Sequence, residues 1–202
     1  MRRWILAAGV VLLSGCATVP PAVHHPHAAW RVHRRALASI RTFALRAAVA
    51  IRAGGHGGSL HLRWREQPAA MEMEGFGPLG DTVFRLHTGP NGAVLVTGKG
   101  RYRAASPDGL LSRMTGWRLP VGGLRYWILG EPRPAIRATY VLDRAGFLGT
   151  LHQAGWVVAY RRYRRTPLGR LPVRLDLARA AGPRTPALHI RIDVSHWSRG
   201  RT

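Results

Sequence analysis

The sequence has little negative charge, almost no lysine and only one cysteine. Asp and Glu together number 9 against 31 Lys and Arg, and Lys99 is the one lysine among 202 residues. A lone cysteine, Cys16, excludes an intrachain disulfide framework. The chain also lacks a long apolar run, because residues 4–13 make up only about half of the roughly 20 residues that a membrane-spanning helix needs.

The shortage of acidic residues also argues against an enzyme. Glu72 and Glu74 are the only close carboxylate pair, and they would share one strand face without a histidine nearby. No Gly-x-Ser-x-Gly nucleophile motif occurs. The cluster His24-His25-x-His27 has no second ligand motif to complete a metal site. We therefore expect no catalytic residues, no metal and no cofactor.

The N-terminus has the pattern of a lipoprotein signal peptide. Arg2 and Arg3 precede the apolar residues 4–13, whose length suits a signal-peptide core. Small residues then lead into Cys16, which predicts removal of residues 1–15 and attachment of a lipid to the cysteine. The alternative is an ordinary secretory signal that happens to end beside a cysteine.

The next segment is expected to be a tether. Residues 16–28 contain Pro20, Pro21 and Pro26 among small residues, which is typical of a flexible linker. Ala17 follows the cysteine in place of aspartate and, by resemblance to bacterial sorting signals, favours the outer membrane. Residues 29–202 then form one domain, long enough for a sizeable core.

Arginine dominates the charge. The formal net charge is +22, or 22 − 2 = +20 once Arg2 and Arg3 are removed. The arginines are spread along strand-like segments, and only residues 161–165 form a dense block, which does not favour nucleic-acid binding. Attraction to an anionic membrane surface fits better, at about 1 kcal/mol per basic residue. The bias could also be compositional.

Hydrophobic periodicity predicts mainly strands. Apolar residues alternate with polar ones over 43–51, 60–64, 171–177 and 188–194, as in an antiparallel sheet with one buried face. Short helices are expected over 30–40, 106–114 and 124–129. A sheet with one apolar face must close, stack on another layer or curl around something. Periodicity alone leaves these alternatives open.

Several motifs resemble the LolB family of outer-membrane lipoprotein receptors, across nearly the whole mature chain. The segment 114–132 contains Thr-Gly-x-x-x-Pro, Leu-Arg-x-Trp and Leu-Gly-x-Pro elements, and 153–160 reads Gln-Ala-Gly-Trp-Val-Val-Ala-Tyr. Residues 77–80 match the family's Pro-Leu-Gly loop. Two departures are Ala47, where glycine is usual and added bulk could alter strand packing, and Glu66, near an expected glutamine. Neither is expected to touch the mechanism.

The resemblance implies a fold and a function. The fold is mainly β (α+β), an open antiparallel half-barrel of about eleven strands with a few short helices over a hydrophobic cavity. The protein would act as a monomer that accepts client lipoproteins from the periplasmic carrier LolA and inserts them into the outer membrane. Leu79, held out by Gly77, Pro78 and Gly80, would enter the membrane. Candidate cavity residues are Leu45, Leu62, Trp64, Leu110, Leu111, Met114, Leu124, Trp127, Ile128 and Trp156.

The same residues also fit other interpretations. The tryptophans could be ordinary core residues, and the Pro-Leu-Gly segment could be an ordinary turn. An envelope protein that holds lipopolysaccharide or another anionic glycolipid would share the compartment and the arginines. A soluble LolA-like carrier is disfavoured by the lipidation signal at Cys16.

Overall fold

A computed structural model describes residues 25–115, 121–183 and 185–200, with the side chains of Met114 and Thr115 excepted. The predicted signal peptide, Cys16 and most of the predicted tether lie outside the described residues.

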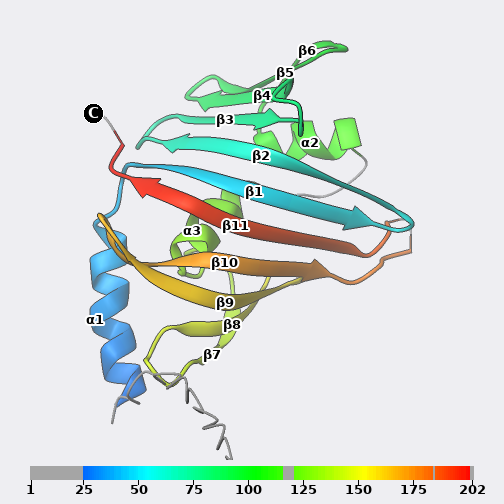
Figure 1. The fold of residues 1–202 in the computed structure, drawn as a ribbon. Helices are drawn as coiled ribbons and strands as arrows, with labels where there is room; N and C mark the ends of the chain where they lie inside the picture. Colours follow the sequence, from blue (N-terminus) through cyan, green and yellow to red (C-terminus); the bar gives the residue numbers. More distant parts are fainter. Residues whose placement is uncertain (1–24, 116–120, 184, 201–202) are drawn as a thin grey trace, which may run out of the picture.

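One antiparallel sheet of eleven strands makes up most of the described chain (Figure 1). Across the sheet the strand order is β6-β5-β4-β3-β2-β1-β11-β10-β9-β8-β7. Two consecutive meanders, β1 to β6 and β7 to β11, are therefore joined where β1 pairs with β11. The strands are β1 (Phe43–Ala53), β2 (His56–Glu66), β3 (Met71–Phe76), β4 (Thr82–Gly89), β5 (Gly92–Thr97), β6 (Gly100–Ala104), β7 (Ala138–Leu142), β8 (Leu148–Gln153), β9 (Trp156–Thr166), β10 (Gly169–Arg179) and β11 (Leu188–Ser198).

The alternating pattern gives the sheet one buried face. In β1 the apolar residues from Phe43 to Val49 are buried at every second position, and polar or small residues face outward between them. The β1–β2 hairpin turns at Gly54, whose positive φ of 58° suits a glycine. Opposite β11, the pairing of β1 shifts between Arg46 and Ala47. The open, mainly antiparallel fold class that the sequence predicts is confirmed.

Three helices accompany the sheet: α1 (Pro26–Ala38), α2 (Pro107–Thr115) and α3 (Val121–Leu129). Figure 1 shows α3 behind β10 and β11, so the side of the sheet nearer the viewer is the outer face, away from α3. The helix α1 begins at Pro26, earlier than the predicted Trp30, because proline suits a first helical turn. No helix in the described ranges has the length and apolarity to cross a membrane.

The start of α3 also differs from the sequence prediction. Gly122 and Gly123, expected before the helix, lie inside it. A Cβ atom on Gly123 would sit 3.2 Å from the ring of Trp127, so the missing side chain leaves room for the indole. The backbone N–H of Gly122 donates to the Asp108 carboxylate at 3.1 Å and thereby links α3 to α2.

Candidate functional site

An apolar cavity of about 730 Å³ lies between the inner face of the sheet and the helices α2 and α3. Strands β1 to β5 and β11 supply one wall, and residues of α2 and α3 supply the other. The charged residues among its described lining are Asp81 and Lys99. Most of the remaining lining is aliphatic or aromatic, so the space suits a hydrocarbon ligand.

Part of the predicted cavity set lines this space. The strands contribute three of these residues and the helices the others, so the wall combines segments far apart in the sequence. Several strand residues of the same wall are missing from the predicted set, although the alternation over 43–51, 60–64 and 188–194 includes five of them. The predicted lining residues are Leu45, Leu62, Trp64, Leu111, Leu124 and Ile128; the missed ones include Val49, Ile51, Leu60, Met73, Phe84, Leu86, Leu95, Ile190 and Ile192.

The structure places Leu110, Trp127 and Trp156 away from this lining, in the buried core. The Trp127 and Trp156 rings pack with centroids 6.3 Å apart. These two tryptophans are therefore packed as ordinary core residues, which was the alternative to a place in the cavity wall. The side chain of Met114 lies outside the described residues.

A buried glutamine holds Trp127 in place. The Gln153 side-chain carbonyl accepts hydrogen bonds from Trp127 Nε1 at 2.8 Å and from the backbone N–H of Arg133 at 2.9 Å. Its amide donates to the carbonyl oxygens of Arg133 and Ile136. Because all these polar groups are paired, the glutamine can be buried without a large penalty. The two motifs that contain Trp127 and Gln153 thus meet in one packing unit.

Glu66, one of the two departures from the family pattern, lies beside the cavity. Its carboxylate accepts a hydrogen bond from Trp64 Nε1 at 3.0 Å and lies 3.3 Å from the Arg125 guanidinium on α3. Trp64 and the neighbouring α3 residue Leu124 both line the cavity. Glu66 therefore fixes one cavity residue and ties α3 to β2.

Burial sets the protonation behaviour of Glu66. Desolvation raises the pKa of its carboxyl above the ordinary value, and the Trp64 hydrogen bond and the Arg125 charge only partly oppose this rise. Glu72 and Glu74, by contrast, form ion pairs with Arg65 and Arg85 on the outer face. The two carboxylates that the sequence analysis considered as a close pair are therefore each bound to an arginine.

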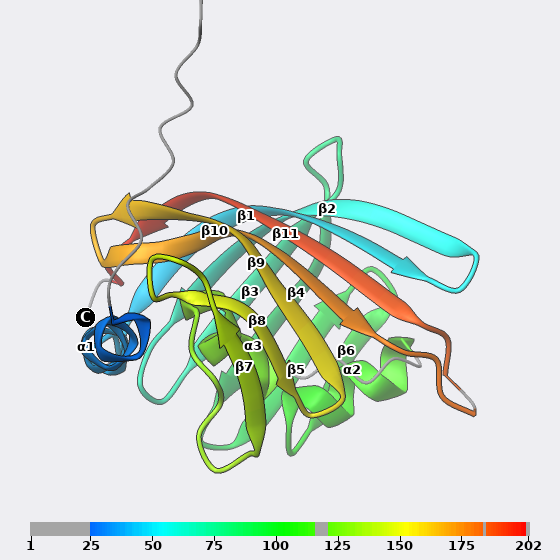
Figure 2. The same cartoon turned by 90° about the horizontal axis from the view of Figure 1, so that it is seen from below.

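The segment 77–80 forms a tight loop between β3 and β4. The N–H of Gly77 donates to the carbonyl of Asp81, and the N–H of Gly80 donates to that of Gly77. Gly80 has a positive φ of 86°, which favours glycine. Leu79 at the tip is 98% exposed, so it makes almost no packing contact. In Figure 2 this teal loop projects away from the layer of α2 and α3.

The described part of the chain contains no cluster of three or more His, Cys, Asp or Glu that could hold a metal. His24 of the N-terminal histidine cluster lies outside the described residues.

An open antiparallel sheet curved over an apolar cavity places the chain in the fold class of open half-barrels. A solved LolA superfamily protein from Nitrosomonas europaea has the same fold, with a TM-score of 0.53, 9% identity and coverage of 85% of this chain and 93% of that one. At that identity the likeness concerns the fold alone.

Sequence comparison gives the family. The family model for outer membrane lipoprotein LolB matches residues 41–197. Outer-membrane lipoprotein LolB of Pseudomonas paraeruginosa is 38% identical over 88% of this chain and 89% of its own length. The Alkalilimnicola ehrlichii LolB is 36% identical over 98% of both chains. The chain belongs to the LolB family of outer-membrane lipoproteins, which are receptors for lipoprotein trafficking and not enzymes.

Proposed function

We propose that the chain receives lipoproteins from a LolA-type periplasmic carrier, shields their acyl chains in the cavity and inserts them into the outer membrane. The observation that carries the proposal is the pairing of an apolar cavity with a fully exposed leucine on a short loop. The cavity would hold the cargo, and the loop would act at the membrane. The chain would be anchored through Cys16 on the periplasmic side.

The hydrophobic effect explains why such a cavity is needed. Each buried methylene is worth about 0.8 kcal/mol, so three acyl chains of roughly 15 methylenes would cost on the order of 30 kcal/mol in water. A carrier and a receptor must therefore both cover the chains. Transfer needs no nucleotide if each successive site binds the chains more favourably, and the membrane is the most favourable of these sites.

The loop supplies the membrane step. Leu79 is solvated in the described structure, so its transfer into the acyl region would release apolar surface from water without unpacking the core. The hydrogen-bonded turn at Gly77 and Gly80 holds the leucine away from the sheet. One chain supplies both the cavity and the loop, which supports action as a monomer.

The first experiment is a reconstituted transfer with carrier loaded with a lipoprotein, the receptor and liposomes. Leu79→Glu should accept cargo as wild type does and fail to insert it, because a charge at the tip opposes entry into the bilayer. Val141→Glu is the matched control, since Val141 is 65% exposed on the edge strand β7. It should transfer normally.

Two results would contradict the proposal. If Leu79→Glu inserts cargo at the wild-type rate, the loop has no membrane role. If wild type captures no cargo from the carrier, the receptor function fails for this chain, and the binding of an anionic glycolipid becomes the leading hypothesis.

A further inference from the structure

A second hollow lies on the outer face of the sheet, opposite the apolar cavity. It is a groove of about 810 Å³ that crosses β1, β2, β9, β10 and β11 and reaches the β3–β4 loop. Its basic residues are Arg46, Arg63, Arg162 and Arg164, together with His61. We refer to these four arginines as the groove arginines.

The groove arginines differ from the ion-paired arginines of the same face, such as Arg161, Arg174 and Arg191. Within the described ranges, none of the four has a carboxylate at ion-pairing distance. Arg63 instead lies over the Phe76 ring at 4.7 Å from its centroid. Asp193 is the one acidic residue of the groove lining, and Arg174 already pairs with it.

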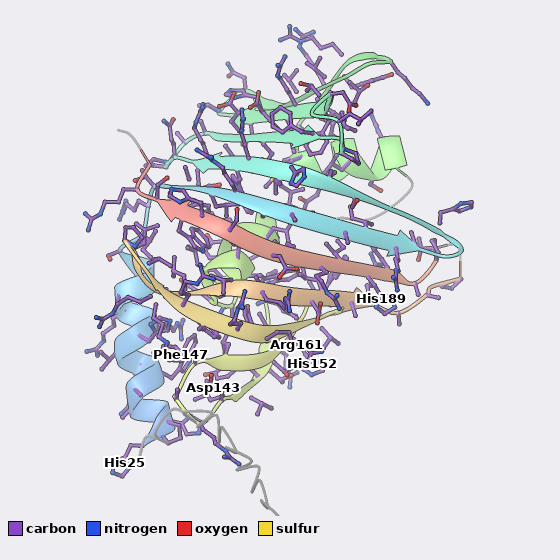
Figure 3. All side chains as sticks on the ribbon, viewed as in Figure 1. His25, Asp143, Phe147, His152, Arg161 and His189 are labelled. Carbon is purple, nitrogen blue, oxygen red and sulfur yellow. The ribbon has the colours of Figure 1, made fainter. Side chains whose placement is uncertain are left out.

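Other arginines of the outer face are held in ion pairs. Arg161 and Arg191 both bind Asp176, at 2.8 and 3.0 Å. Figure 3 labels Arg161, which lies on β9 on the outer face. The groove therefore brings four arginines without an ion-pair partner in the described ranges into one hollow, whose shape concentrates their field.

The β3–β4 loop separates the groove from the cavity. Gly77, Pro78 and Gly80 line the groove, whereas Asp81 begins the stretch that lines the cavity. Leu79 stands between the two and belongs to neither lining. A membrane that receives Leu79 would therefore bring its lipid headgroups to the groove.

We propose that the groove binds the phosphate groups of anionic phospholipids in the leaflet that Leu79 enters, and so orients the loop for insertion. Arginine guanidinium groups bind phosphate oxygens through charge-assisted hydrogen bonds, which suits unpaired arginines beside a membrane-facing loop. This inference rests on the membrane role of the loop in the proposed function. It adds to that function a binding site for lipid headgroups and predicts that loop insertion depends on the charge of the lipids.

The test uses the full lipid-anchored chain in liposomes, so that every variant is held at the surface alike. A polarity-sensitive dye on Leu79→Cys reports loop insertion, and a dye on the exposed groove residue Ala48→Cys reports shielding from an aqueous quencher. Lipidation is expected to occupy Cys16, which leaves one thiol for labelling. Liposomes are phosphatidylcholine alone or with about one lipid in four replaced by phosphatidylglycerol.

Arg162→Gln with Arg164→Gln is the test variant, and Arg161→Gln with Arg191→Gln is the matched control. Both pairs remove two positive charges from the same face, but the control pair is bound to Asp176. In the anionic liposomes the test variant should lower the ratio of docked to undocked protein about 25-fold, whereas the control should stay near wild type. High salt should reduce the wild-type signal in the same way.

Equal quenching of the Ala48 dye in neutral and anionic liposomes would overturn the headgroup site. Equal losses in the test and control variants would also overturn it, because net charge alone would then explain the effect. If the test variant instead loses cargo capture from the carrier while its groove stays shielded, the arginines serve carrier docking and the inference fails. A shielded groove with no Leu79 insertion would refute the loop step of the proposed function and leave the headgroup site standing.

Discussion

Glu66 shows how a single buried carboxylate connects the sheet to the helix above the cavity. It pairs with Trp64 on its own strand and with Arg125 on α3. The sequence marks this position only as a departure from the family pattern. Its role depends on contacts between segments some sixty residues apart, which neither composition nor periodicity encodes.

Glu66→Gln should change stability in a pH-dependent way. Because the folded pKa of Glu66 is raised, wild type loses stability as pH rises from the unfolded pKa through the folded one. Glutamine does not titrate and can still accept the Trp64 hydrogen bond. The free energy of unfolding of the variant, measured by urea unfolding, should therefore rise relative to that of wild type as the pH increases above about 4.5. A constant stability difference across this range would contradict the pKa direction.

Gln153→Leu should be strongly destabilising. It leaves the indole N–H of Trp127 and the backbone N–H of Arg133 without their acceptor, which should cost about 3 kcal/mol of unfolding free energy. His152→Leu is the control, because this neighbouring side chain is exposed and should change stability by less than about 0.5 kcal/mol. Chemical denaturation of both variants measures the difference. Similar values would mean that the glutamine network contributes little.

At the scale of elements, strands are predicted better than helices or the cavity. The alternation over 43–51 and 188–194 predicts β1 and β11 because a half-buried strand repeats every second residue. The two glycines at the start of α3 led to a predicted helix that begins too late. Packing against Trp127 overrides their low helix propensity. The cavity lining is only partly predictable, since burial in a wall and burial in a core select the same apolar residues.

The β4–β5 turn depends on Gly92. Its φ of 105° is unfavourable for other residues, and an added Cβ would lie 2.6 Å from the carbonyl oxygen of Ala104 on β6. Gly92→Ala should therefore lower the unfolding free energy by about 1–3 kcal/mol. Gly98→Ala, with open space around its Cβ, should be close to neutral. Thermal unfolding of both variants checks this, and equal melting temperatures would contradict it.

At the scale of the whole molecule, substitutions in the cavity wall and in the core should have different effects. Those in the wall should change cargo binding, and those in the core should change stability. Leu62 lines the hollow, whereas Leu175 is packed in the core at 1% exposure. Leu62→Phe should leave the free energy of unfolding close to that of wild type. It should reduce cargo capture, because the larger ring fills part of the space that the acyl chains would occupy. Leu175→Phe should cost about 1–3 kcal/mol through overpacking. Denaturation and capture from the loaded carrier measure the two effects, and unchanged capture by Leu62→Phe would argue against this cavity as the cargo site.

The pairing of β1 with β11 has a consequence for folding. These strands occupy the middle of the sheet, yet they lie at opposite ends of the domain sequence, with Ala44 opposite Ser198. When the chain emerges with its N-terminus first, β1 to β6 can pair in order. The other edge of β1 stays unpaired until β11, the last strand, is available. Such a long-range closure slows folding and leaves an exposed strand edge until translocation ends. The centre of the sheet is therefore the last part to form.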